Sequence, residues 1–132
     1  MLLEYMICWK QRSYDLIYFK TDMLKKKILQ LQWMFFDVDG ILTDGSLVYE
    51  AGGEISKKFN VLDGYGIKNL IHSGISVGLI SSRDHPATRA RAIELGIDNL
   101  MLGKDDKVDA FRSWSNVAKV NPKNCGHMGD DY

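Results

Sequence analysis

Short apolar segments recur along the chain, and polar or glycine-rich residues follow each of them. Residues 33–38 and 75–80 are bulky, nearly continuous apolar runs, and 97–102 and 125–128 are shorter candidates. Runs of this length that end at turn signals are typical of buried β-strands. The pattern therefore predicts four strands.

Helices are expected between these strands. The predicted helices cover residues 67–72, Pro86 to Leu95 and 105–117. Gly74 and Gly96 stand where helices commonly end, and Pro86 suits a first helical turn. Strands that alternate with helices predict an α/β fold with a mostly parallel sheet and helices on both of its faces.

A β-hairpin is predicted as an insertion after the first strand. Residues 46–50 and 55–60 favour two strands, and Ala51-Gly52-Gly53 between them is a turn signal. The glycine-punctuated segment 61–66 is then expected to form a loop before the first helix of the sheet.

The first strand ends in two carboxylates, Asp37 and Asp39. Residues two apart on a strand share a face, and open α/β sheets bind ligands at the carboxyl ends of their strands. Two close carboxylates repel each other unless a cation or a shared proton intervenes. The pair therefore indicates a metal site, a proton-transfer role, or only a turn in which Asp and Gly end a strand.

The other strands also end in residues that carry chemistry. Ser81 follows the second strand, Lys107 begins the helix after the third, and Asp130 follows the last. Because parallel strands place their carboxyl ends at one edge of a sheet, these residues are expected to converge. Taken singly, Ser81 suits a turn cap and Lys107 suits an exposed helix start.

Two groups of residues resemble known protein families. Asp37-Val38-Asp39-Gly40-Ile41-Leu42-Thr43-Asp44-Gly45, the downstream serine and lysine, and the final Gly-Asp-Asp resemble the haloacid dehalogenase (HAD) superfamily of phosphotransferases. Residues 59–67, residues 80–83 and the hairpin before them are similar to 3-deoxy-D-manno-octulosonate 8-phosphate (KDO 8-phosphate) phosphatases. The resemblance covers residues 33–132 and implies a Rossmann-like HAD fold with a Mg²⁺-dependent phosphatase activity.

The resemblance also implies a role for each residue. Asp37 is expected to be the nucleophile that forms an aspartyl-phosphate, and Asp39 the general acid and then base. Ser81 is expected to donate a hydrogen bond to a phosphoryl oxygen, and Lys107 to supply positive charge beside the nucleophile. Mg²⁺ is expected as cofactor, bound by the side chains of Asp37 and Asp130 and the main-chain carbonyl of Asp39.

The expected substrate is a small phosphorylated sugar acid, KDO 8-phosphate, used in lipopolysaccharide synthesis. Arg83 suits the sugar carboxylate because its guanidinium is a bidentate donor, although a surface salt bridge is an equal alternative. Asp63 and Gly64 are expected in the substrate region, or in a plain tight loop. The alternatives are a phosphatase for a nine-carbon keto-sugar acid phosphate and a non-catalytic HAD module that serves assembly.

The small hairpin bears on assembly. Relatives of this family form tetramers in which a neighbour's hairpin covers the site, so a homo-tetramer is expected, with Leu47, Val48 and Tyr49 as apolar contacts. Relatives also continue past Gly-Asp-Asp with another acidic residue, so the domain is expected to be incomplete at its C-terminus. Loss of an acidic residue that supports the metal ligands typically lowers metal affinity or activity about 10–100-fold.

Charge and cysteine content narrow the class of protein. Lys and Arg together number 17, as do Asp and Glu, so no overall field favours nucleic acid or an anionic membrane. No apolar run approaches the length that spans a bilayer. Cys8 and Cys125 form no metal-like pair, which favours a reduced, cytoplasmic setting.

Residues 1–32 are expected to be an N-terminal extension. Residues 1–22 are rich in aromatic side chains but contain interspersed charges and lack the order of a signal peptide. They suit an amphipathic helix on a partner or membrane surface, or an upstream extension before a natural start at Met23, which is the preferred interpretation. The lysines at 25–27 are expected to be a solvated lead into the first strand.

Overall fold

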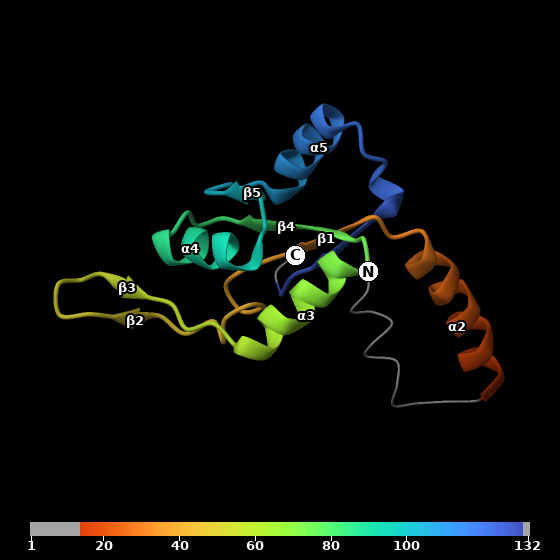
Figure 1. Cartoon of the computed structure of the whole chain (residues 1–132), viewed down its shortest axis with the longest axis horizontal. Helices are drawn as coiled ribbons and strands as arrows, with labels where there is room; N and C mark the ends of the chain where they lie inside the picture. The colour runs from red at the N-terminus through yellow and green to blue at the C-terminus, as the bar shows by residue number, and fades with distance from the viewer. Residues whose placement is uncertain (1–13, 131–132) are drawn as a thin grey trace.

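The central feature of the fold is a parallel four-stranded sheet in the order β5-β4-β1-β6 (Figure 1). The computed structural model describes residues 14–130, with side chains from residue 22 onward. The strands are β1 (Trp33–Phe36), β4 (Ser76–Ser81), β5 (Asn99–Leu102) and β6 (Cys125–Met128). The predicted parallel sheet is confirmed, and β1 lies between β4 and β6.

Helices cover both faces of this sheet, as predicted (Figure 1). They are α3 (Val61–His72) and α4 (Pro86–Leu95) on one face and α5 (Lys107–Ala118) on the other. Side chains alternate along β1, so that Met34 and Phe36 pack in a core cluster with Ile67 of α3, whereas Phe35 packs with Phe111 of α5. The alternation of apolar residues in β1 thus divides the core into two layers.

An aromatic cluster attaches α5 to the sheet. The ring centroids of Phe35 and Trp114 are 4.7 Å apart at an interplanar angle of 73°, and those of Phe35 and Phe111 are 5.5 Å apart at 78°. Trp33 meets Trp114 edge to face at 4.8 Å. Such pairs contribute roughly 0.5–1.5 kcal/mol each beyond their buried area. The cluster therefore fixes the position of α5, whose first residue is Lys107.

Helix α3 begins at Val61, so the loop predicted over 61–66 is wrong. The side-chain oxygen of Asn60 accepts a hydrogen bond from the Leu62 amide at 2.9 Å and caps the helix. Gly64 lies buried in the helix, where a Cβ would come within 2.3 Å of Arg91 Nη2 and 3.1 Å of Leu95 Cδ2. Close packing on α4 therefore outweighs the low helix propensity of glycine.

The predicted hairpin is present but its strands are short. Strands β2 (Val48–Tyr49) and β3 (Ile55–Ser56) pair antiparallel, and the ribbon projects from the sheet (Figure 1). The Gly53 amide closes the turn by donating to the Glu50 carbonyl at 2.8 Å. Both residues of β2 are exposed, so no packed layer extends the pairing over 46–50 and 55–60.

The N-terminal part contains helix α2 (Tyr14–Leu29), which lies to one side of the sheet in Figure 1. The lysines at 25–27 belong to its last turns and not to an extended lead. Residues 1–13, the first part of the predicted extension, lie outside the described residues. Among the residues described, no helix is both long and apolar enough to span a bilayer. A 3₁₀ turn, η2 (Pro122–Asn124), precedes β6.

Candidate active site

Asp37 directly follows β1 and is held from three sides. Its amide donates to the Met128 carbonyl at 2.9 Å, which continues the pairing of β1 with β6. Its Oδ1 accepts a hydrogen bond from the Val38 amide at 2.7 Å. The residue is only 4% exposed, so its carboxylate has little access to water. A buried carboxylate needs a charged or hydrogen-bonding partner.

Lys107 supplies that partner. Its Nζ donates to Asp37 Oδ2 at 2.5 Å, and the two side chains are 16% and 5% exposed, respectively. Helix α5 begins at Lys107, two residues later than predicted, because the Asp106 side chain caps it by accepting from the Asp109 amide at 2.8 Å. A charge-assisted hydrogen bond with this little solvent is among the stronger polar contacts.

The loop after Asp37 brings a third carboxylate close. Gly40 has φ +83°, and a Cβ built on it would lie 1.9 Å from Asp130 Oδ2, so the Asp130 carboxylate rests against the Gly40 backbone. Thr43 Oγ1 fixes this loop by accepting from the amides of Gly40 at 3.3 Å and Gly45 at 3.2 Å. The turn therefore requires glycine at position 40 for both conformation and space.

A cavity of about 290 Å³ opens at the carboxyl ends of these strands. It is lined by Asp37, Asp39, Gly45, Leu47, Ser81, Ser82, Arg83, Lys107 and Asp130. All of the residues to which the sequence assigned a catalytic or metal-binding role lie here, because β1, β4 and β6 are parallel neighbours. Leu47 enters from the segment before β2, so the hairpin insertion also contributes to the wall.

Ser81 is the last residue of β4 and is buried, at 2% exposure. Its Oγ accepts from the Arg83 amide at 3.3 Å, which leaves the hydroxyl hydrogen able to donate to a ligand. Serine at this position therefore suits an anionic ligand.

Arg83 is exposed beside the cavity, and its neighbour Asp84 does not pair with it. Asp84 binds Arg89 instead, with Nε–Oδ1 at 2.7 Å and Nη2–Oδ2 at 2.5 Å. This hydrogen bonding and charge lower the pKa of Asp84 and raise the pKa of Arg89. The Arg83 guanidinium makes no ion pair within the described part of the chain.

Asp63 and Gly64 do not lie with these residues. Both belong to α3 and line a small hollow with Phe59 and Arg91, outside the cavity that contains Asp37. The predicted substrate-binding role of Asp63 and Gly64 has no support from this placement and stays a prediction.

The donor set at the cavity fits Mg²⁺. Asp37 and Asp130 offer two carboxylates beside the main chain of Asp39, and Mg²⁺ commonly uses one or two carboxylates and completes its shell with water and substrate oxygens. From residue 22 to 130, no cluster of three or more Asp, Glu, His or Cys side chains is arranged to hold a metal ion. Two carboxylates and one main-chain carbonyl would leave the other positions around Mg²⁺ to water and substrate oxygens.

Lys57 is a residue that the sequence analysis missed. It follows β3, its side chain is 4% exposed, and its Nζ donates to Asp39 Oδ1. Asp39 is 31% exposed in the same pair. Nothing in the Lys57-Lys58 dipeptide indicates that one of the two side chains is buried. Only the fold of the hairpin brings it to the loop after β1.

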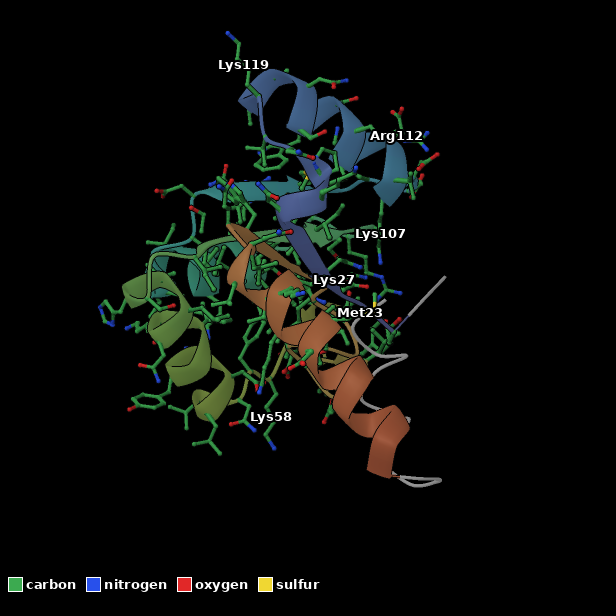
Figure 2. The ribbon with its side chains drawn as sticks, turned by 90° about the vertical axis from the view of Figure 1, so that its right-hand side faces the viewer. Met23, Lys27, Lys58, Lys107, Arg112 and Lys119 are labelled. Atoms are coloured by element: carbon green, nitrogen blue, oxygen red, sulfur yellow. The ribbon has the colours of Figure 1, made fainter. Side chains whose placement is uncertain are left out.

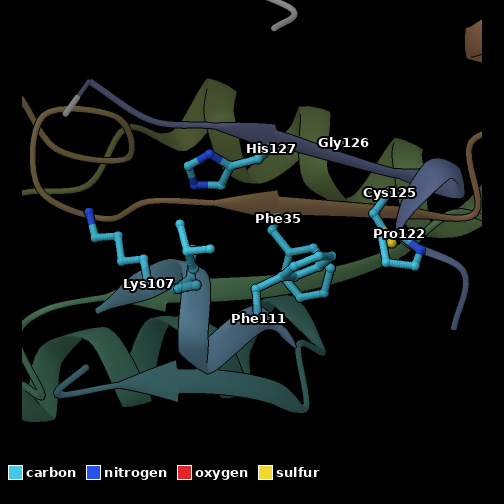
Figure 3. A pocket seen from close by; sticks show the side chains of 9 residues that line it. Phe35, Lys107, Phe111, Pro122, Cys125, Gly126 and His127 are labelled. Carbon is cyan, nitrogen blue, oxygen red and sulfur yellow. The ribbon is translucent and has the colours of Figure 1, made fainter. Parts of the chain in front are cut away.

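A second cavity of about 260 Å³ lies between α5 and β6 (Figure 3). Phe35, Phe111, Pro122 and Cys125 contribute to its mainly apolar wall, and Lys107 lies at one end. Burial raises the pKa of the Cys125 thiol, so this cysteine is a poor nucleophile. The apolar residues of this second cavity suit packing of α5 against the sheet. Lys107 lines both this cavity and the carboxylate-lined cavity.

No protein-family model matches the chain. In sequence it is 41% identical over 108 residues to the 3-deoxy-D-manno-octulosonate 8-phosphate phosphatase of Haemophilus influenzae, over 82% of this chain and 60% of that protein. The chain thus spans about three-fifths of the length of the curated relatives it matches.

Comparison with solved structures identifies proteins of the same description. The phosphatase of the same description from Moraxella catarrhalis, in complex with magnesium, phosphate and KDO, matches with a TM-score of 0.77 and 36% identity, over 80% of this chain and 61% of that one. A Legionella pneumophila structure assigned to subfamily III A of the HAD superfamily matches with a TM-score of 0.83 and 30% identity, over 88% and 64% of the two chains. The similarity in fold therefore accompanies similarity in sequence.

Proposed function

Because the chain belongs to the HAD superfamily over the region that it shares with these proteins, we propose that it is a Mg²⁺-dependent phosphatase of KDO 8-phosphate. The observation that carries this proposal is the buried pair of Asp37 and Lys107 at a cavity that Asp39, Ser81 and Asp130 also line. A carboxylate that is both fixed and beside a cation suits attack on an anionic phosphoryl group.

In this mechanism Asp37 is the nucleophile. One of its carboxylate oxygens bonds to phosphorus while the bond from phosphorus to the sugar oxygen breaks, which gives an aspartyl-phosphate. The contacts of Asp37 with Lys107 and the Val38 amide fix its orientation before attack. Lys107 also lowers the repulsion between the carboxylate and the phosphoryl oxygens, and the Ser81 hydroxyl donates to one of those oxygens.

Asp39 acts as the general acid and then as the general base. In the first step its carboxyl group donates a proton to the departing sugar oxygen, and in the second it accepts a proton from the water that attacks the aspartyl-phosphate. Asp39 suits this role because it lines the cavity two residues after Asp37 and is partly exposed. The sugar leaves as a neutral alcohol after the first step, and inorganic phosphate leaves after the second.

In this proposal the side chains of Asp37 and Asp130 and the main-chain carbonyl of Asp39 would hold the metal. When bound, Mg²⁺ supplies charge neutralisation for the phosphoryl oxygens. Asp130 rests against Gly40, so the loop after β1 and the end of β6 are fixed relative to each other before any ligand binds.

We propose that Arg83 binds the sugar carboxylate. It lines the cavity, and no carboxylate in the described part of the chain neutralises its guanidinium. A guanidinium forms two parallel hydrogen bonds with a carboxylate, which favours a sugar acid over a neutral sugar. A nine-carbon keto-sugar acid phosphate carries the same two anionic groups and is the comparison substrate.

The proposal also includes an oligomeric state, a cellular location and domain boundaries. Leu47, Val48 and Tyr49 are 44%, 49% and 64% exposed on or beside the projecting hairpin, which suits contact with other copies in a homo-tetramer. We propose a cytoplasmic phosphatase domain over residues 33–132, with residues 1–32 as an extension. Sedimentation as a stable monomer would contradict the assembly. Loss of folding or activity on truncation to Met23 would contradict the extension.

The test is phosphate release from KDO 8-phosphate by the purified chain with Mg²⁺, beside Asp37→Asn and the nine-carbon analogue. We expect release that requires Mg²⁺ and vanishes in Asp37→Asn. Release that this substitution leaves unchanged would exclude the assigned nucleophile, and preference for the nine-carbon substrate would exclude the substrate assignment. No release from either substrate would favour a non-catalytic module.

A further inference from the structure

We propose that Lys57 is a positioning residue that holds the Asp39 carboxyl group in place for proton transfer to the leaving group. This inference rests on the proposed phosphatase function. Its basis is the ion pair between Lys57 Nζ and Asp39 Oδ1, which joins the hairpin insertion to the loop after β1 across 18 positions of sequence.

The burial of Lys57 indicates a specific role. Lysine side chains are almost never fully buried unless they are paired, because both desolvation and lost side-chain freedom oppose burial. The Lys57 side chain is 4% exposed, whereas the adjacent Lys58 lies at the surface (Figure 2). The chain therefore places one of two consecutive lysines beside a partly exposed carboxylate that lines the cavity.

The contact constrains one of the two oxygens of Asp39. Oδ1 accepts from Lys57, while Oδ2 has no hydrogen-bond partner among the side chains that the structure describes. Oδ2 is therefore the oxygen available to the substrate. A carboxyl group on a loop has free rotation about two side-chain bonds, and a fixed ammonium at one oxygen removes most of that freedom.

The ion pair of Lys57 with Asp39 also gives the hairpin a second role, besides forming part of the cavity wall. Lys57 follows β3 directly, so its position depends on the pairing of β2 with β3. Asp37 depends instead on Lys107 at the start of α5. The nucleophile and the acid therefore have separate lysine partners from separate elements, and Lys57 can be removed without disturbing the Asp37 pair.

Leaving-group dependence tests this inference. The departing sugar oxygen needs a proton, whereas the nitrophenolate released from p-nitrophenyl phosphate does not. We expect Lys57→Met to lower kcat for KDO 8-phosphate roughly 10–100-fold, as expected for a misplaced catalytic group, and kcat for p-nitrophenyl phosphate less than about 3-fold. Lys57→Arg, which keeps the charge, should restore part of the loss. Lys58→Met is the matched control and should match the wild type on both substrates.

Equal loss on both substrates by Lys57→Met would overturn the inference, and so would no loss on either. A wild-type chain that hydrolyses neither substrate would refute the proposed function, and the catalytic part of the inference with it. Urea denaturation of Lys57→Met, Asp39→Asn and the double variant then tests the contact separately. Stability losses that simply add would show that the two side chains do not interact.

Discussion

The Lys107 ammonium lies 2.5 Å from the Asp37 carboxylate, although the two residues are 70 positions apart in the sequence. The pair joins the start of α5 to the end of β1, and the aromatic cluster packs the same two elements against each other. Both side chains are largely excluded from solvent. Their interaction is therefore less screened than that of a surface ion pair.

Lys107→Met should reduce both activity and stability. Loss of the cation should lower phosphate release about 10²–10³-fold, in the range seen when one electrostatic contact to a reacting group is removed. It should also cost about 3–5 kcal/mol in the free energy of unfolding, because the Asp37 charge stays buried without its partner. Urea denaturation measures the second effect.

The double variant Lys107→Met/Asp37→Asn is the control for that stability loss. A neutral amide no longer requires a cation, so most of the stability lost in Lys107→Met should return. A double variant as unstable as Lys107→Met would show that the lost stability comes from packing and not from the unpaired charge.

Gly40→Ala should be far more harmful than Gly53→Ala. Both glycines have φ near +80°, so each alanine costs about 1–2 kcal/mol of backbone strain. A Cβ at Gly53 meets nothing within 4 Å, whereas one at Gly40 meets Asp130 Oδ2 at 1.9 Å. Thermal unfolding compares the two variants. Asp130→Ala should relieve part of the defect in Gly40→Ala, and no relief would contradict the collision.

Gly78→Ala and Gly66→Ala should change stability in opposite directions. Gly78 lies in β4, where a Cβ would stand 2.4 Å from Phe35 Cε1, so overpacking should cost about 1–3 kcal/mol. Gly66 lies on the exposed side of α3 with nothing within 4 Å, and alanine there should add about 0.5–1 kcal/mol through helix propensity. Destabilisation by Gly66→Ala in urea denaturation would contradict helix α3 at this position.

The ion pair of Asp84 with Arg89 should be visible in a pH titration. The hydrogen bond from Arg89 lowers the pKa of Asp84 below its ordinary value near 3.8. Because the folded-state pKa is lowered, this contact favours the folded state above that ordinary value, and its contribution is lost as the pH falls through the lowered pKa. Carboxyl NMR should detect the lowered pKa, and Arg89→Gln should return it toward normal. An unchanged titration in Arg89→Gln would exclude the contact as its cause.

The parallel sheet was predictable from the local pattern of apolar residues. The meeting of the site residues at its edge was predictable because parallel strands share that edge. The run before Asp37 is continuously apolar, and the carboxyl ends of parallel strands meet at one edge. Asp37, Ser81 and Asp130 therefore line one cavity as expected.

The features that were not predicted depend on contacts between distant segments. Gly64 and Gly66 favour a loop by propensity, whereas packing of Gly64 against α4 and the Asn60 cap favour the observed helix. Lys57 and Lys58 look alike in sequence. The course of the hairpin decides which of them is buried, and no local pattern records that course.

The alternation of side chains along β1 makes this strand intolerant of a change in length. Inserting or deleting one codon within Trp33–Phe36 would exchange the layers that Phe35 and Phe36 enter, and would turn the carboxylate at the strand's end away from α5. Replacing a residue of this strand with another of similar size leaves the alternation of side chains unchanged. Only conservative replacements within Trp33–Phe36 are therefore expected to preserve both core layers and the position of Asp37.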